Sequence, residues 1–228
     1  MAPPRPQAAA PHRARWTRSI PAFALALGLL AMLLGTALPA AAQNPWDALS
    51  EVRRSLEALG PSVADFEQTY QPAGFSGLER EAGKVSLDLP DCLRWDYRDP
   101  FPKSYLICSG QVYSWEEGDK IGQRAKVDAS REVGLDLVLL AVDELRLRYS
   151  AETLDTDGGV LEIRLTPVVD TERLSEAVLR IAGQPQRLRE VSYRDAAGGR
   201  TTFTLSDYQS LEDRSAFTPP PGLDWKEP

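Results

Sequence analysis

The feature that most constrains this fold is an alternation of apolar and polar side chains with a period of two, which recurs between residues 82 and 206. Val85, Leu87 and Leu89 alternate with polar residues, and Phe203 and Leu205 do the same near the far end. Because successive side chains of a strand point to opposite faces, the pattern predicts strands buried on one face only. Glycine-containing turns separate neighbouring segments, which favours antiparallel hairpins. The sequence therefore predicts a mainly β chain.

About nine or ten antiparallel strands are expected from these segments. Residues 116–131 between them are polar and rich in turn formers, and the tail at 217–222 is expected to be extended. The predicted strands span residues 66–70, 82–89, 93–97, 105–108, 111–115, 144–154, 160–166, 174–181, 187–193 and 201–206.

Two segments have helical patterns instead. Residues 45–59 carry apolar side chains at spacings of three and four, and Gly60-Pro61 interrupts the pattern. Residues 132–143 are predicted to form a second helix, which is apolar on most sides. Such a helix must be buried by other elements or must itself cover an apolar surface. One strongly curved antiparallel sheet with helices on one face accounts for the order of elements.

The first 42 residues have the pattern of a secretory signal. Arg13, Arg15 and Arg18 precede an apolar run at 20–38, and small residues at 40–42 follow it. We expect cleavage near Ala42 and export, with one domain at 43–228. No cysteine stands at the expected cut, so no lipid tether is expected there. The alternative is a membrane anchor, because the apolar run is near the minimum length of a membrane-spanning helix.

Composition excludes several function classes for residues 43–228. Four of the 26 basic residues lie in the first 42 positions, which leaves 22 against 33 acidic residues and a net charge of −11. That charge argues against nucleic acid or an anionic membrane surface as the main partner. The single histidine, His12, lies in the signal, so histidine-based triads and zinc sites are excluded. We expect no metal, no cofactor and no catalytic residues.

The two cysteines flank a predicted hairpin turn at residues 98–103. If the hairpin centres near Pro100, residues whose numbers sum to 200 face each other, and Cys92 lies opposite Cys108. A cross-strand disulfide is then geometrically reasonable in an oxidising compartment. A redox-active pair is the alternative, but there is no C-x-x-C motif. The same register places Leu93 opposite Ile107 and Trp95 opposite Tyr105.

A set of short motifs recurs in a fixed order along the chain and resembles the LolA family of outer-membrane lipoprotein carrier proteins. The resemblance covers nearly all of residues 45–225. The motifs are Phe66-x-Gln68, Gly83-x-Val-x-Leu-x-Leu-Pro90, Leu93-Arg-Trp95-x-Tyr97, Pro100, Ile107-x-x-Gly110, Val112-Tyr-Ser-Trp115, Leu161-x-Ile-x-Leu-x-Pro167, the hairpin from Asp195 to Asp207, and Phe217-x-Pro-Pro-x-Gly222.

This resemblance implies an incomplete β-barrel covered by a helical lid, and a monomeric carrier located in the periplasm. Its cavity would hold acyl chains of a lipoprotein taken from an inner-membrane transporter and delivered to an outer-membrane receptor of the same fold. The family usually has an arginine before the proline of the early strand, which helps to hold the lid closed. Here Leu89 stands before Pro90, so that closing mechanism does not carry over.

The candidate ligand-binding residues are the apolar side chains of the predicted wall and lid; ordinary core packing is the alternative for each of them. The wall candidates are Val85, Leu87, Leu93, Trp95, Tyr105, Ile107, Tyr113, Trp115, Leu161, Ile163, Leu165 and Phe203. The lid candidates are Trp46, Leu49, Val52, Leu137, Leu139 and Leu140.

The leading hypothesis is a carrier of lipoproteins or other lipids. A second is a periplasmic lipid-sensing domain that signals to a membrane partner. A third is a secreted carboxylate-dependent hydrolase, which ranks last because no close acidic pair has the apolar surround that would raise one pKa.

Overall fold

The computed structural model describes residues 44–127, 137, 142–155, 157–169 and 174–227. The chain divides into two units, residues 1–41 and 42–228, and all described residues belong to the second. The predicted signal and its cleavage near Ala42 lie outside the described residues. So does most of the helix predicted at 132–143, including Leu139 and Leu140, whereas Leu137 is described and buried.

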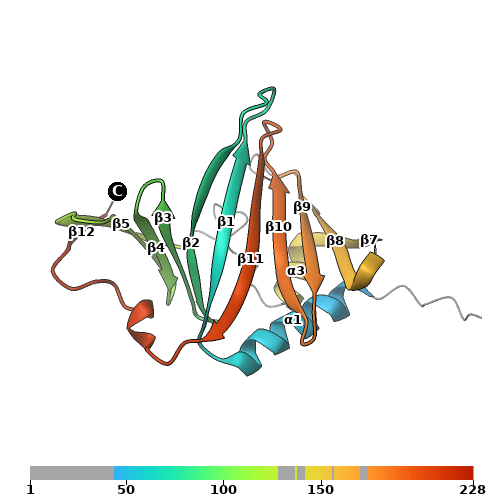
Figure 1. Ribbon diagram of the computed structural model, residues 1–228, viewed down its shortest axis with the longest axis horizontal. Helices are drawn as coiled ribbons and strands as arrows, with labels where there is room; N and C mark the ends of the chain where they lie inside the picture. The colour runs from blue at the N-terminus through green and yellow to red at the C-terminus, as the bar shows by residue number, and fades with distance from the viewer. Residues whose placement is uncertain (1–43, 128–136, 138–141, 156, 170–173, 228) are drawn as a thin grey trace, which may run out of the picture. The chain divides into compact units, whose positions relative to one another are not determined.

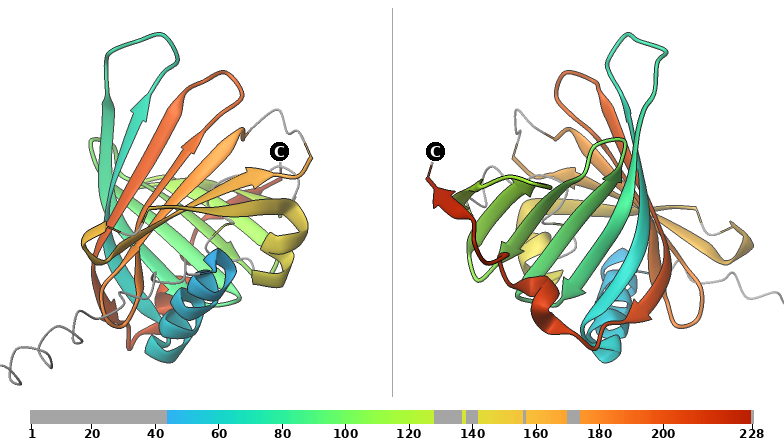
Figure 2. Two further views of the ribbon diagram at one scale, coloured as in Figure 1. Left: turned by 90° about the vertical axis from the view of Figure 1, so that its right-hand side faces the viewer. Right: turned by 60° about the vertical axis from the view of Figure 1, so that its left-hand side comes forward.

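One sheet of twelve strands dominates the second unit (Figure 1). Its order is β12-β6-β5-β4-β3-β2-β1-β11-β10-β9-β8-β7, and within the described residues its two edge strands do not pair with each other. The sheet is therefore open, and it bends so that its two halves face one another (Figure 2). The predicted curved, incomplete barrel is confirmed. The strands are β1 (Ser62–Gln71), β2 (Glu79–Asp88), β3 (Cys92–Asp99), β4 (Lys103–Cys108), β5 (Gln111–Glu116), β6 (Ile121–Lys126), β7 (Tyr149–Asp155), β8 (Val160–Pro167), β9 (Glu176–Ala182), β10 (Arg187–Arg194), β11 (Arg200–Ser210) and β12 (Asp224–Lys226).

The hairpin of β3 and β4 has the predicted register. Cys92 pairs with Cys108, Leu93 with Ile107, and Trp95 with Tyr105. The two cysteines form a disulfide across the hairpin, with their Cα atoms 4.2 Å apart. The turn prolines and the alternation were thus sufficient to set the pairing of these two strands.

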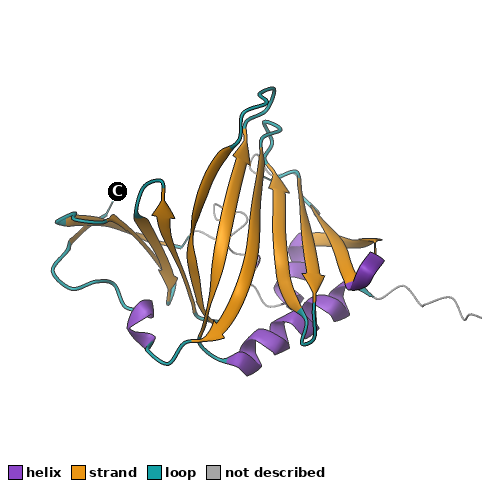
Figure 3. Ribbon diagram, viewed as in Figure 1, coloured by secondary structure: helices purple, strands orange, loops and turns teal. Residues whose placement is uncertain are grey.

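Helix α1 (Pro45–Leu59) lies on the concave side of the sheet (Figures 2 and 3). The Asn44 side chain caps it by accepting a hydrogen bond from the backbone N–H of Trp46 at 2.9 Å, and Pro45 occupies its first turn. It ends at Gly60, whose φ of 73° favours glycine. Its buried face packs near β7, β10 and helix α3 (Val142–Arg148). The predicted helix at 45–59 is therefore confirmed.

Three local predictions were wrong. Residues 144–148 were expected in a strand but lie in α3, whose acidic first turn and basic last turn match the helix dipole. Strand β6 lies within the segment expected to be turn-rich, since its mostly polar sequence shows little apolar alternation. The strand β12 runs parallel to β6 after the 3-10 turn at Arg214–Phe217, so the sheet is not wholly antiparallel.

Candidate functional site

The concave face of the sheet is apolar across eight neighbouring strands, from β3 through β2, β1, β11, β10 and β9 to β8 and the start of β7. Residues directly opposite in a ladder share a face, so the register defines this surface. Val85 faces Trp95, which faces Tyr105, and Ile163 faces Leu179. Among the predicted wall residues it carries Val85, Leu87, Leu93, Trp95, Tyr105, Ile107, Leu161, Ile163, Leu165 and Phe203, all buried except Tyr105, which is partly buried.

Two predicted wall residues lie on the opposite, convex face. In β5, Ser114 pairs with Tyr105 and continues the concave face, so Tyr113 and Trp115 point the other way. Their rings pack edge-on against Trp225 of β12, with centroids 5.1 Å and 5.9 Å away. Gly122 makes room for Trp225, since a Cβ there would lie 2.3 Å from the indole ring. The placement of Tyr113 and Trp115 in the wall is therefore corrected.

An aromatic cluster occupies the middle of the concave face. The ring centroid of Phe66 lies 4.6 Å from Trp95 and 4.9 Å from Tyr97, both in edge-to-face contact. Phe203 completes the group at 4.8 Å from Trp95. Phe66 is absent from the predicted site, although its partial alternation in β1 placed it in a strand. Close packing of these rings gives the central wall a defined, rigid surface.

The cover of the concave face is the buried side of α1 together with Leu137 and α3. Between cover and wall remains an apolar cavity of about 40 Å³, which has room for a few waters. Leu49, Val52 and Leu137 of the predicted lid contribute to its lining, and Trp46 lies beneath the Arg146 guanidinium at 5.6 Å. The cavity is lined by Leu49, Val52, Arg53, Leu56, Leu137, Val142, Leu145, Leu179 and Leu188.

A polar network borders the aromatic cluster. The Tyr97 hydroxyl donates to Gln68 Oε1 at 2.7 Å, and Gln68 Nε2 donates to Glu81 Oε2 at 3.2 Å. Lys103 Nζ pairs with Glu81 and lies 4.6 Å from the centre of the Tyr97 ring. Burial, and then the nearby Glu81 carboxylate, raise the pKa of Tyr97 well above its ordinary value of 10.0. Tyr97 is therefore a neutral donor at physiological pH.

The raised pKa of Tyr97 predicts a loss of stability in alkali. Above about pH 10 the unfolded chain loses the tyrosine proton while the folded chain keeps it, so the free energy of unfolding falls as pH rises. The slope is about 1.4 kcal/mol per pH unit for each such tyrosine. Denaturant unfolding of the wild type and Tyr97→Phe between pH 7 and 11.5 measures it. Above pH 10 the free energy of unfolding should fall less steeply with pH in Tyr97→Phe than in the wild type, by about 1.4 kcal/mol per pH unit. Equal slopes in the two proteins would contradict the raised pKa of Tyr97.

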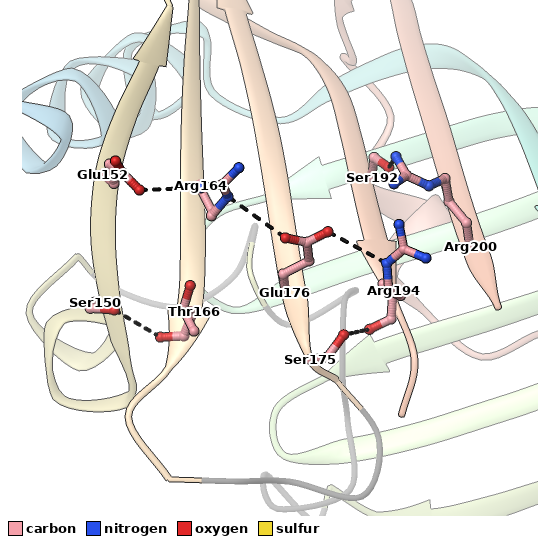
Figure 4. Close-up of polar contacts among 9 residues, drawn as sticks. All are labelled: Ser150, Glu152, Arg164, Thr166, Ser175, Glu176, Ser192, Arg194 and Arg200. Carbon is pink, nitrogen blue, oxygen red and sulfur yellow. Dashed lines mark hydrogen bonds and ion pairs between the residues drawn. The ribbon is translucent and has the colours of Figure 1, made fainter. Parts of the chain in front are cut away.

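The convex face of β7 to β10 is polar, in contrast to the concave face. Glu152, Arg164, Glu176 and Arg194 form a row of alternating charge across four strands (Figure 4). Successive N···O distances in the row are 3.3 Å, 3.6 Å and 3.5 Å. Partly exposed ion pairs of this kind add little stability, but their charged groups keep this face hydrated. These four strands are therefore polar on the convex side and apolar on the concave side.

Within the described part of the chain, no group of three or more histidine, cysteine, aspartate or glutamate side chains is placed to hold a metal ion. No helix among the same residues is long and apolar enough to cross a membrane.

An open, strongly bent sheet whose apolar concave face is covered by a helix defines a class of half-barrel proteins with an interior suited to apolar ligands. The family model described as outer membrane lipoprotein carrier protein LolA matches residues 61–219. The chain belongs to the LolA family.

Two curated relatives are similar in sequence over most of the chain, and one solved structure is similar in fold. An outer-membrane lipoprotein carrier protein of Xanthomonas oryzae pv. oryzae is 27% identical over 201 residues, which cover 85% of this chain and 91% of the relative. A protein of the same name from Xanthomonas campestris pv. campestris is 28% identical over the same lengths. The structure of an uncharacterized conserved protein from Thermus thermophilus has a TM-score of 0.53 at 9% identity, over 80% of this chain and 98% of that one. This last likeness concerns the fold.

Proposed function

We propose that this chain is a periplasmic carrier that holds the acyl chains of lipoproteins or related lipids between its concave face and α1. The proposal includes export after cleavage near Ala42 and shuttling, as a monomer, from an inner-membrane transporter to an outer-membrane receptor. The observation that carries it is the apolar concave face, which is continuous over eight strands and faces a helix. Membership in the LolA family and the names of the curated relatives support it. No catalytic step is proposed.

The physical basis is the removal of acyl methylenes from water, which stabilises a complex by about 0.8 kcal/mol for each methylene. The cavity under α1 has a volume of about 40 Å³, so an acyl chain that enters it would displace α1 from the wall. A partner then favours loading or release by binding the open and closed states with different affinity.

Closure of α1 relies on apolar contacts rather than on a cation before Pro90. Leu89 packs against the core cluster, where the family usually has arginine. Apolar closure suits a cover that acyl chains replace, because the chains offer the same kind of contact.

Native mass spectrometry of the protein purified from periplasm without detergent tests the carrier proposal. We expect co-purified lipid or an acylated protein, or uptake of a triacylated lipoprotein on incubation. A mass that stays free of ligand after incubation with lipids and with the lipoprotein would overturn the proposal.

A further inference from the structure

Three aromatic rings form a shelf on the convex face of the sheet, on the opposite side from the proposed cargo space. They belong to Tyr113 and Trp115 of β5 and to Trp225 of β12, and all three residues are partly exposed. The rings of Tyr113 and Trp115 stand at 78° and 86° to the ring of Trp225. Partly exposed apolar side chains that gather on one surface are typical of binding sites.

The rings of this aromatic shelf are fixed in place by their neighbours. Trp225 lies against Gly122, which has no Cβ to displace the indole ring. The Arg94 guanidinium lies 5.1 Å from the centre of the Trp115 ring, and it donates a hydrogen bond to the backbone oxygen of Ala216 at 3.1 Å. A surface that is ordered before its ligand arrives loses little conformational entropy on binding.

An open hollow of about 490 Å³ adjoins the Tyr113 end of the shelf. On the convex side of the β5–β6 ladder, Tyr113 pairs with Arg124, and Gln111 pairs with Lys126. These four residues line the hollow together with Glu227, whose carboxylate lies 2.9 Å from Arg124. Within the described residues, Gln111 and Lys126 make no side-chain hydrogen bond or ion pair, so their polar groups are available to a ligand.

A second hollow, of about 420 Å³, adjoins the Trp115 end of the shelf. Trp115 pairs with Ser104, and Ser104 pairs with Asp96, so all three side chains lie on the convex face. They line this hollow with Arg98 and Glu117, and the Ser104 hydroxyl donates to Asp96 Oδ1 at 2.7 Å. This hollow therefore also combines a ring with charged and hydroxyl groups.

The two hollows lie in line along β5. Gln111, in the first hollow, and Trp115, in the second, are four residues apart, which is about 13 Å in an extended strand. The site is thus elongated, with ring surface along its middle and polar groups at both ends. A ligand that matches it is itself long, and has both apolar surface and many groups that donate and accept hydrogen bonds.

We propose that the aromatic shelf and its two hollows bind a linear saccharide. The faces of a pyranose ring carry C–H groups that pack against aromatic rings, and its hydroxyl groups both donate and accept hydrogen bonds. Lys126 would donate to sugar oxygens in the first hollow, and Asp96 would accept from sugar hydroxyls in the second. A lipid tail does not match this site, because it would leave these polar groups without partners. The inference is independent of the proposed carrier function, which concerns the other face of the sheet.

The indole N–H signals of the tryptophans test this inference by NMR. Residues 43–228 contain four tryptophans, of which Trp46 and Trp95 belong to the concave side and Trp115 and Trp225 to the shelf. Proton–nitrogen spectra are recorded with cellohexaose, chitohexaose and hexagalacturonate, which are neutral, N-acetylated and acidic. We expect at least one hexamer to shift the signals of Trp115 and Trp225 and to leave the other two in place. Its monosaccharide should bind about tenfold more weakly or less, because it reaches one part of the site.

Two variants remove a ring from the shelf and keep an apolar side chain. Trp225→Leu and Tyr113→Leu should each weaken binding of the hexamer by about tenfold or more, and the dispersion of each spectrum shows whether the variant is folded. Phe75→Leu is the matched control, because its ring is 70% exposed in the loop between β1 and β2, away from the shelf, and its loss should leave saccharide binding unchanged.

No shift with any of the three hexamers would overturn the inference. Shifts confined to Trp46 and Trp95, or equal binding by Trp225→Leu, Tyr113→Leu and the wild type, would overturn it as well. Each of these results would leave the carrier proposal standing, since that proposal is tested with lipids and with a lipoprotein.

Discussion

Gly83→Ala should be strongly destabilising, lowering the free energy of unfolding by about 3 kcal/mol or more. A Cβ at residue 83 would lie 2.0 Å from the backbone oxygen of Asp96 and 2.9 Å from the Phe66 ring. The backbone of β3 cannot retreat easily, because it is paired on both sides, with β2 and with β4. Denaturant unfolding of the variant measures the loss.

Gly77→Ala is the control for this prediction. Gly77 lies in the loop between β1 and β2, where a Cβ would meet nothing within 4 Å. Its substitution should change the free energy of unfolding by less than about 0.5 kcal/mol. If both alanine variants were equally stable, the close approach of β2, β3 and Phe66 at Gly83 would be refuted.

Leu56→Asp should release α1 from the concave face. Leu56 is buried between the helix and the wall, where an unpaired carboxylate would cost several kcal/mol to bury. Moving α1 into water avoids that cost but exposes the apolar wall. We expect the free energy of unfolding to fall by about 3 kcal/mol or more, binding of the dye ANS to rise, and trypsin to cleave at Arg53 or Arg54.

Ala58→Asp places the same carboxylate on the exposed side of the same helix. It should leave ANS binding and trypsin sensitivity at the level of the wild type. Equal behaviour of the two aspartate variants would mean that α1 does not depend on its buried face, and would contradict its role as the cover.

Local sequence patterns were sufficient to predict an element when a single clear signal, such as a helix cap or a turn, defines its ends. Asn44 and Pro45 mark the start of α1 and Gly60 marks its end, so its bounds were predictable from capping and backbone preference. Turn prolines between β3 and β4, together with the alternation, were sufficient for the pairing of Cys92 with Cys108. These interactions join residues that are close in sequence.

Local patterns did not predict which side chains point inward when both faces of a strand are covered by other parts of the protein. In β5 the large aromatic residues Tyr113 and Trp115 face outward, because Trp225, more than 100 residues later, packs over them. Hydrophobicity alone favours placing the larger side chains inside, so Tyr113 and Trp115 were predicted on the concave face although they lie on the convex face. Strand β6 was missed for a related reason, since its partner β12 comes from the distant C-terminal tail.

Local patterns along the chain were enough to predict the strand-rich class, the helix at 45–59, the disulfide hairpin and the family, because each follows from periodicity, capping or ordered motifs. The three-dimensional fold was needed to show which side chains share the concave face and how closely α1 covers it. Those properties depend on strand order and on contacts between distant residues, which no local pattern contains.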